Sequence, residues 1–405
     1  MSKQAEVGSD WERSFERWLE PFLEVLGDKR RRRWAPLYVR GLIAPGDRKS
    51  VQPLANRVAA GEHEQLHHFV ATSLWDCAPL EQVLLEKAND VVGGRDAHLI
   101  IDDTALVKKG EHSVGVAQQY CGQLGKNANC QSLVSLTLSR NEVPVLVGLR
   151  LYLPEQWAND VQRRKRCGVP DEVVFKPKWQ IALDEIKRIR AGQAEFGDVL
   201  ADAGYGVCSD FRRKLCEMGL KYVVGVSSEQ LVYPLTARVR TPEREHAMGR
   251  PPRRGSASKQ PRKAKDAIAA LGTKAFQRLS WRSGSKGPLQ AEFTAARVRP
   301  ADGPPVHGHR HGPGDEQWLV CERRSNGETK YYLSNYPPNT SLHELASAAK
   351  ARWSCEQAHQ QVKEELGLDH FEGRKWHGLH HHALLTMIAY AFLQYLRLSQ
   401  KRIAA

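Results

Sequence analysis

The sequence predicts an α/β protein with a mixed-sheet core, a helical segment before the core and a β-rich insertion within it. Three observations lead to this prediction. Residues 10–90 carry apolar side chains at helical spacing, residues 97–226 alternate short β-rich runs with helical segments, and residues 227–345 combine β-like runs with loop-forming residues. The chain has 405 residues, which is enough for two or three cores.

Residues 1–92 are predicted to form an N-terminal helical domain. Its first apolar side chains recur at three- and four-residue steps: Trp11, Phe15, Trp18, Leu19 and Phe22. A basic run follows at 29–33, and further helical stretches lie around 49–60 and 62–73. A helical bundle with a basic face is typical of DNA-binding modules. The alternative is a helical cap whose Arg and Lys side chains are only solvated.

Residues 93–226 are predicted to form the first part of the core. The apolar run 97–101 ends on Asp102 and Asp103, which indicates a buried strand that delivers acids to its end. The β-rich runs 131–138 and 143–151 are separated by Asn141-Glu142, a hairpin signal. The next predicted elements are a helix at 179–190, a strand at 198–201 leading into Asp202 and a glycine-containing turn, a helix at 210–218 and a strand at 222–226.

Residues 227–343 are predicted to be a β-rich insertion with basic loops, and residues 344–405 to be helices that complete the core. Residues 238–265 and 300–314 are rich in Pro, Gly and basic residues, which favours open loops. β-like segments are predicted at 275–281, 290–298, 318–324 and 330–333, and helices at 344–366 and 380–398.

Composition favours a polyanionic partner. The formal net charge is +14, and DNA or RNA is the usual partner of such a chain. The eight cysteines are dispersed without a C-x-x-C pair, which disfavours a structural zinc site and a disulfide framework. An apolar run of the roughly 18–20 residues needed to span a bilayer is missing, as is a signal-peptide pattern. We therefore expect a cytoplasmic protein without a membrane partner.

Three carboxylates are candidate catalytic residues because of their positions in the predicted strands and helices. Asp102 and Asp202 are predicted at the ends of strands, and Glu356 lies within a predicted C-terminal helix. Carboxylate oxygens are the ligands that Mg²⁺ prefers, and three acids at one point would repel strongly without metal. Two metal ions roughly 3.5–4 Å apart can activate a nucleophile and stabilise the leaving oxygen in phosphoryl transfer.

The helix predicted over 344–366 places two basic residues beside Glu356. At about 100° per residue, Arg352, Glu356 and Lys363 fall at about 0°, 40° and 20° around the helix axis, so all three project from one side. A salt-bridged surface helix would show the same pattern.

These residues carry a family resemblance. Arg352, Glu356 and Lys363 fit R-x3-E-x6-K, which resembles the helix signature of the YREK group of DDE transposases from bacterial insertion sequences. Several further segments resemble the insertion-sequence-701 type: Ile101–Thr104, Lys108–Gly110, His112–Val116, Leu200–Gly206, Glu365–Asp369, Arg48–Val51 and His68-Phe69. The resemblance spans nearly the whole chain. It implies a ribonuclease H-like core with the β-rich insertion before the last catalytic helix.

The resemblance also implies the site. Asp102, Asp202 and Glu356 are expected to be the catalytic acids and ligands of Mg²⁺, with two ions and with Mn²⁺ as a substitute. Asp103 is the fallback for Asp102, because neighbouring strand residues face opposite sides. The residues expected to contact DNA are Arg352, Lys363, Lys108, Lys109, Arg48 and Lys49.

The implied partners are double-stranded DNA, as terminal inverted repeats and target, and a second copy of the chain that pairs two ends. The protein would associate with the bacterial nucleoid when bound to DNA. One residue departs from the signature, because its tyrosine would fall on Ala349. Tyr331, Tyr332 and Tyr336 are the alternatives for its role.

Other interpretations stay open. The histidines at 377 and 380–382, or those at 307, 309 and 311, are candidate metal ligands, although a polar helix start and a loop are the alternatives. Trp281 and Trp318 are candidates for stacking on an extruded base, or else core residues. The alternative functions are a ribonuclease H-like nuclease that cuts without joining and a catalytically silent DNA-binding protein derived from a transposase.

Overall fold

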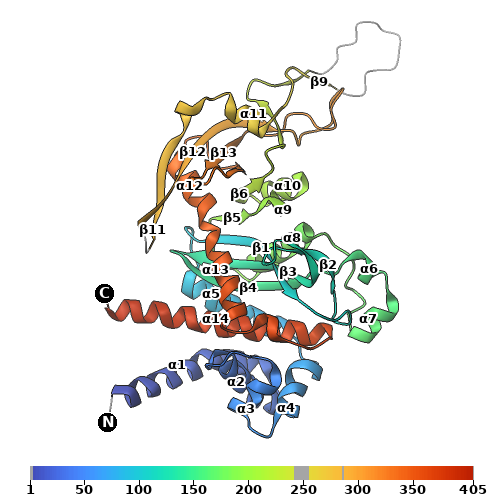
Figure 1. Ribbon diagram of the computed structural model, residues 1–405, viewed down its shortest axis with the longest axis vertical. Helices are drawn as coiled ribbons and strands as arrows, with labels where there is room; N and C mark the ends of the chain where they lie inside the picture. The colour runs from blue at the N-terminus through green and yellow to red at the C-terminus, as the bar shows by residue number, and fades with distance from the viewer. Residues whose placement is uncertain (1–2, 241–254, 285–286, 405) are drawn as a thin grey trace. The chain divides into compact units, whose positions relative to one another are not determined.

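The computed structural model describes residues 3–240, 255–284 and 287–404. The chain forms two compact units (Figure 1). The first unit comprises Met1–Gly197 and Trp353–Ala405, and the second comprises Asp198–Arg352. The boundaries inferred above, at 92/93, 226/227 and 343/344, stay predictions. Much of the loop expected at 238–265 lies outside the described residues.

Helices occupy most of residues 3–92, the region that the sequence predicted to be helical. They are α1 (Lys3–Leu26), α2 (Lys29–Ile43), α3 (Val51–Val58), α4 (His63–His67), a π-helical turn (His68–Thr72) and α5 (Ala78–Val92). The apolar stripe of α1 is buried from Phe15 onward, and the ring of Phe15 lies 5.3 Å from that of Phe392 in the C-terminal helix α14 (Trp376–Ala404). These helices therefore share the first unit with the C-terminal helix.

The sheet of the first unit is built on β3 (Lys126–Arg140). Strands β1 (His98–Val107), β2 (Ala117–Cys121) and β4 (Val143–Leu151) all pair antiparallel with it. The predicted hairpin is confirmed, since Asn141 and Glu142 join β3 to β4 with φ of 50° and 63°. Positive φ at both central residues is the requirement of the type I′ hairpin turn, and Asn accepts it readily.

The prediction that Asp102 closes the first strand is wrong. Asp102 is the fifth residue of the ten-residue strand β1, and pairing with β3 continues to Val107, opposite Cys130. Two adjacent acids are unfavourable in a strand by propensity, and this suggested an end. The pairing with β3 overrides that local preference.

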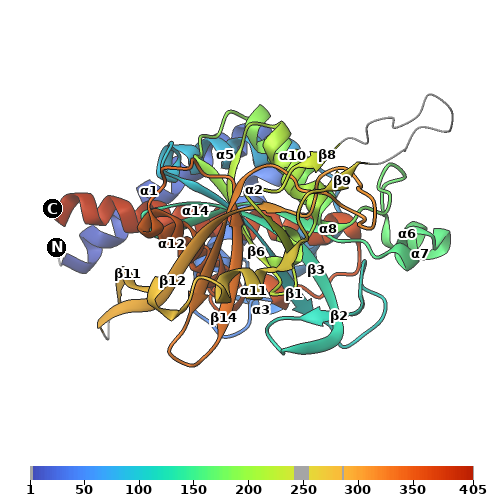
Figure 2. The same cartoon turned by 90° about the horizontal axis from the view of Figure 1, so that it is seen from above.

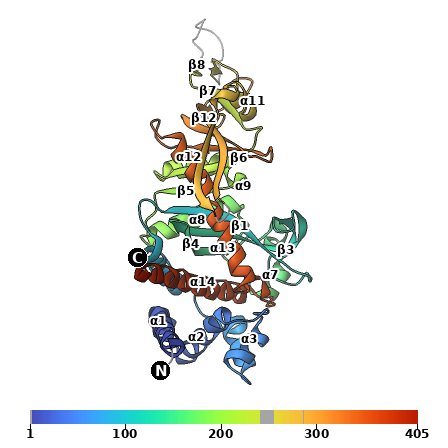
Figure 3. The ribbon, with the colours of Figure 1, turned by 60° about the vertical axis from the view of Figure 1, so that its left-hand side comes forward.

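Register assigns each acid of β1 to a face of the sheet. Asp102 lies opposite Ser135, and Asp103 lies opposite Val134, so their side chains point to opposite faces. The Asp102 face is covered by α13 (Trp353–Glu364), which contacts β1, β3 and β4 (Figure 3). The opposite face is covered by α5 and α8 (Lys178–Ala191), since Lys178 binds Asp103 there.

The single helix predicted over 344–366 is wrong. It is divided into α12 (Leu342–Ala351) and α13, with Arg352 between them. The break falls where the chain passes from the second unit to the first. The sequence lacks a glycine or proline there, so local propensity did not indicate it. Arg352 therefore lies outside the helix that carries Glu356 and Lys363.

The second unit contains a mixed sheet. Its strand order is β10-β7-β12-β13-β14-β6-β5. Strands β5 and β6 are parallel, and the other neighbours are antiparallel. In addition, β11 pairs antiparallel with β12 (Figure 2). The strands are β5 (Asp198–Ala201), β6 (Lys221–Val226), β7 (Leu231–Pro234), β10 (Arg262–Lys263), β11 (Gln277–Gly284), β12 (Gly287–Pro300), β13 (Gln317–Arg323) and β14 (Thr329–Ser334). A separate pair joins β8 (Val239–Arg240) to β9 (Ser256–Ala257). The predicted α/β class is confirmed, and the strands from β7 to β14 fall within residues 227–343.

Helices complete both units. The second unit holds α9 (Ala203–Gly206), α10 (Ser209–Glu217), α11 (Ala264–Ala269), a 3₁₀ turn (Thr273–Ala275) and α12. The first also holds α6 (Glu155–Ala158), α7 (Val161–Cys167) and a 3₁₀ turn (Leu368–His370). Every described helix falls short of the length or the apolar character that crossing a bilayer requires.

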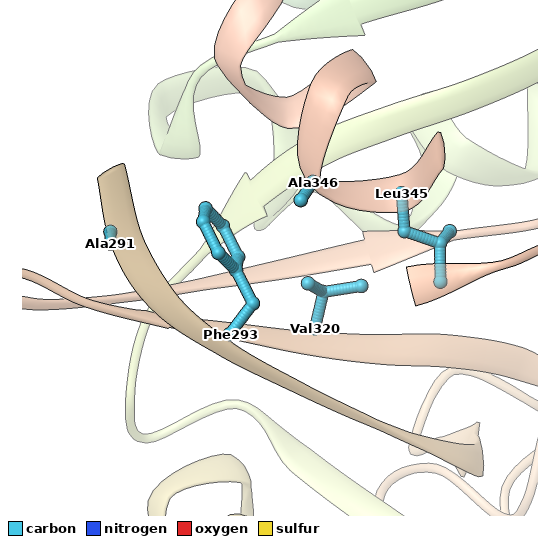
Figure 4. Packing of buried hydrophobic residues seen from close by; sticks show 5 residues of the cluster. All are labelled: Ala291, Phe293, Val320, Leu345 and Ala346. Atoms are coloured by element: carbon cyan, nitrogen blue, oxygen red, sulfur yellow. The ribbon is translucent and has the colours of Figure 1, made fainter. Parts of the chain in front are cut away.

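A small apolar cluster joins α12 to the β12–β13 ladder. Phe293 and Val320 project from the strands toward Leu345 and Ala346 of the helix (Figure 4). Trp281 and Trp318 pack against this cluster, and the Trp318 indole N–H donates to the Pro337 carbonyl at 3.0 Å. These contacts favour the interpretation of both tryptophans as core residues.

The histidine run 380–382 lies in α14, which packs between α2 and β4 (Figure 1). His382 is fully buried; its Nδ1 lies 2.8 Å from the Tyr38 hydroxyl, and its Nε2 lies 3.2 Å from the Gly367 and Leu368 carbonyls. A neutral ring satisfies all of these groups, accepting at Nδ1 and donating at Nε2. These bonds favour a structural role over metal binding.

His382 predicts a loss of stability in acid. Burial lowers its pKa from 6.5 to about 4, so the folded protein holds the ring neutral while the unfolded chain protonates it near pH 6.5. The stability that neutral His382 contributes to the folded protein is therefore fully present above pH 6.5 and is lost as pH falls toward 4. We expect His382→Gln to reduce the slope of unfolding free energy against pH by about 1.4 kcal/mol per unit in that window. Urea unfolding at several pH values measures this, with exposed His67→Gln as the control; equal slopes for all three proteins would contradict it.

Candidate active site

Asp102 presents a half-buried carboxylate on the face of β1 that α13 covers. Its Oδ1 accepts a hydrogen bond from the Asp103 backbone N–H at 2.8 Å, which orients the carboxyl group. Its backbone carbonyl accepts a bond from the Ser135 hydroxyl at 3.1 Å. The acid is therefore held by a paired strand and by the side chain directly across the ladder.

Cys355 and His359 project from α13 onto the same face. The His359 Nε2 lies 2.7 Å from the Ser135 Oγ, and the Cys355 Sγ lies 3.3 Å from the Thr137 Oγ1. One ligand atom from each of Asp102, Cys355 and His359 lies within 4.8 Å of the other two. This cluster was not predicted from the sequence. Its signal was the Cys-x3-His spacing, which places both side chains on one side of a helix.

Glu356 lies at the margin of this contact face and is exposed. At about 100° per residue it is about 60° around the helix from His359 and about 20° from Lys363. The first unit therefore holds two of the predicted acids, Asp102 and Glu356, on one side of the sheet, with the carboxylate of Glu356 open to solvent.

Asp202 belongs to the second unit and follows β5 directly, as predicted. Its Oδ1 accepts from the backbone N–H groups of Gly204 at 2.9 Å and Tyr205 at 3.4 Å, so the carboxylate caps α9. The turn requires glycine, because a Cβ on Gly206 would lie 1.9 Å from the Gly225 carbonyl oxygen. This close packing of α9 on β6 fixes the backbone that carries Asp202.

Asp103 lies on the opposite face from α13. Its Oδ2 accepts from the Lys178 Nζ at 2.6 Å, and both side chains are about one-third exposed, at 35% and 30%. The fallback acid is thus engaged by α8, away from the helix that carries Glu356.

The basic residues expected to contact DNA fall into two groups. Lys49 is 3% exposed and its ammonium donates to the Ala44 carbonyl, while the Lys108 ammonium donates to the Phe371 carbonyl at 2.6 Å. Burial lowers the pKa of Lys49, Lys108 and Lys363. Arg48 and Lys109 are exposed, and Arg48 forms an ion pair with Glu372. Of the six residues, Arg48 and Lys109 are therefore better placed to contact a phosphate than the buried lysines.

The residue at the signature tyrosine position, Ala349, is 7% exposed in α12. Two of the alternative tyrosines are engaged within the second unit. The Tyr332 hydroxyl donates to the Glu322 Oε2 at 2.8 Å, and the Tyr336 hydroxyl donates to Asp198. Both bonds satisfy buried carboxylates, which indicates a structural role for these two tyrosines.

Comparison with known proteins identifies the family. A model of the DDE superfamily endonucleases matches residues 21–288. The chain is 34% identical over 197 residues to a probable transposase for insertion sequence element IS701 from Microchaete diplosiphon, an alignment that covers 47% of this chain and 48% of that protein. The chain thus spans about half the length of this relative, and the resemblance predicted from its motifs is confirmed.

Two solved structures are distantly similar. One is a cryo-EM structure of the piggyBac transposase synaptic complex with hairpin DNA, at 11% identity and a TM-score of 0.42, covering 91% of this chain and 66% of that one. The other is the NurA nuclease from Sulfolobus solfataricus, at 10% identity and a TM-score of 0.25, covering 77% and 92%. Likenesses this weak support no inference about the chain. The family match covers more than half of the sequence, and the protein belongs to the DDE superfamily of endonucleases.

Proposed function

We propose that the protein is a DNA transposase that cuts the ends of a mobile element and joins them to target DNA by metal-dependent phosphoryl transfer. The family membership and the similarity to an IS701 transposase support the reaction class. The observation that carries the proposal is that Asp102 projects from the sheet face on which α13, the helix of Glu356, packs. A ribonuclease H-like arrangement of the core is part of this proposal.

The residues of the first unit fit a divalent ion. Asp102 and Glu356 offer oxygen ligands, one half-buried and one exposed, and hard cations such as Mg²⁺ prefer such donors. When bound, two Mg²⁺ or Mn²⁺ ions would supply activation of a water and charge stabilisation at the scissile phosphate. The hydrogen bond from the Asp103 backbone N–H orients the Asp102 carboxylate before any ion binds. The role of Asp202 rests on the family resemblance of residues 200–206.

DNA binding is proposed for the exposed basic residues. Arg48 and Lys109 would contact phosphates, and binding would weaken steeply with salt. The partly buried Arg352 and Lys363 are proposed as further phosphate contacts because they match the basic positions of the family signature. Two copies of the chain would act together, since two ends must be held at once. The proposed location is the bacterial cytoplasm, at the nucleoid when DNA is bound.

Plasmid nicking tests the proposal. We expect the wild type to nick supercoiled DNA with Mg²⁺ or Mn²⁺ and to be inactive with a chelator, while Asp202→Asn and Glu356→Gln lose the activity and still bind DNA. Full activity in both variants would contradict the assigned acids. DNA binding without nicking, even on DNA that flanks the gene, would favour the catalytically silent binding protein.

A further inference from the structure

The side chains between α13 and the sheet include donors that a magnesium site does not use. Cys355 is fully buried and His359 is 8% exposed, and both come from one helix face. Asp102 completes a set of one thiol, one imidazole and one carboxylate whose ligand atoms lie within 4.8 Å of one another. Thiol and imidazole together select zinc-like ions over Mg²⁺.

We infer that Asp102, Cys355 and His359 form a binding site for a thiophilic divalent ion of the Zn²⁺ class. The distances on α13 support this. The Cys355 Sγ and the His359 Nε2 are 3.5 Å apart. Tetrahedral zinc with Zn–S of roughly 2.3 Å and Zn–N of roughly 2.05 Å places its sulfur and nitrogen ligands about 3.6 Å apart. The two protein donors therefore already stand at the separation that the ion requires.

The environment supplies the other requirements of such a site. The Ser135 hydroxyl lies 2.7 Å from the His359 Nε2 and 3.8 Å from the Cys355 Sγ, so a polar atom borders the position between them. The strand pairing and the Asp103 N–H hold Asp102 in place. Three protein ligands leave a fourth position for water or for the Ser135 hydroxyl.

Binding changes the protonation of two side chains. The Cys355 thiol loses its proton to solvent and binds as the thiolate. The ring proton of His359 must sit on Nδ1 so that Nε2 can donate its lone pair to the ion. One proton is thus released for each ion bound, apart from any that Asp102 gives up, and affinity falls as the solution becomes more acidic.

The inferred site shares Asp102 with the proposed catalytic site. Binding of the zinc-class ion does not rest on the proposed function, but its effect on DNA cleavage does. An ion of the zinc class held by Cys355 and His359 would occupy the Asp102 carboxylate and inhibit cleavage that depends on Mg²⁺.

Metal binding without DNA tests the inference independently of any activity. The chelator-treated protein is dialysed against micromolar free zinc, and bound zinc is measured by atomic absorption. We expect the wild type to retain one ion more than Cys355→Ser or His359→Gln, with affinity reduced about 100-fold or more in each variant. Cys321→Ser removes a buried cysteine of the second unit and should keep the ion, as should Glu356→Gln.

Cobalt provides a second measurement that needs only the wild type. Co²⁺ in a tetrahedral site with a thiolate ligand gives visible d–d bands and a thiolate charge-transfer band in the near ultraviolet. Both bands are expected in the wild type, and both should fall when zinc is added. Equal zinc content in the wild type and both ligand variants, or a cobalt spectrum without the charge-transfer band, would overturn the inference. A failure of the nicking assay would leave both results unchanged.

Discussion

Asp102→Asn is expected to abolish metal-dependent DNA cleavage, whereas Asp103→Asn is expected to retain it. Register places the two carboxylates on opposite faces of the sheet, and α13 covers the face of Asp102. Removing a direct metal ligand should reduce the rate by more than the 10–100-fold that is typical of outer-shell partners. Asp103→Asn removes a partly exposed ion pair with Lys178, which costs less than about 1 kcal/mol of stability.

This expectation is checked by the rate of plasmid nicking, measured for both variants at the same protein concentration. Melting curves establish that each variant is folded. A large loss in Asp103→Asn with full activity in Asp102→Asn would reverse the assignment and make Asp103 the ligand.

Arg150→Met is expected to destabilise the first unit by about 3–5 kcal/mol, because it leaves a buried carboxylate without its cation. The two terminal guanidinium nitrogens of Arg150 donate to the Glu81 oxygens at 2.5 Å, and its Nε donates to Glu185 at 2.8 Å. The Glu81 side chain is 8% exposed and that of Glu185 is 9% exposed. Glu185 keeps a second partner, Arg188, so Glu81 bears most of the loss.

The effect of Arg150→Met should depend on pH in a defined direction. Burial alone raises the pKa of Glu81, but the hydrogen bonds and charge of Arg150 outweigh it and hold the pKa below 4.5. In the wild type this pair stabilises the fold above pH 4.5, and the contribution is lost as pH falls through the lowered pKa. Without Arg150, burial is opposed only by the charges of Arg188 and His380, so the pKa of Glu81 should rise. Protonation of Glu81 should then reduce the stability difference between the variant and the wild type as pH falls.

Urea unfolding of the wild type, Arg150→Met and Arg150→Met/Glu81→Gln measures these effects. The double variant removes the stranded charge and should recover most of the stability. A loss of unfolding free energy that is independent of pH and persists in the double variant would show that packing, rather than the unpaired carboxylate, causes the destabilisation.

Local patterns in the sequence predicted much of the fold. The β3–β4 hairpin followed from Asn141-Glu142, and Asp202 was expected after a strand because an apolar run precedes it and glycines follow. The continuation of β1 beyond Asp102 depends on pairing with β3, which is distant in sequence. The break at Arg352 coincides with a boundary between compact units, which is also a property of tertiary structure.

The candidate site was predicted in part for the same reason. Charged side chains at the expected ends of strands and within a helix made Asp102 and Glu356 candidates from the sequence, and their role stays a proposal. Cys355 and His359 look like ordinary packing residues until α13 is placed against Ser135 and Thr137. Similarly, Lys49 looks like a phosphate ligand in sequence, yet its ammonium is engaged by the Ala44 carbonyl.

The most direct test of the account is a strand-joining assay on the DNA that flanks the gene. A labelled duplex carrying that end is incubated with a target plasmid, Mg²⁺ and the protein, with Glu356→Gln as the control. The account predicts that the labelled 3′ end becomes covalently joined to the plasmid by the wild type alone. Cleavage of the end without joined product would contradict the transposase assignment and favour a nuclease that cuts without joining.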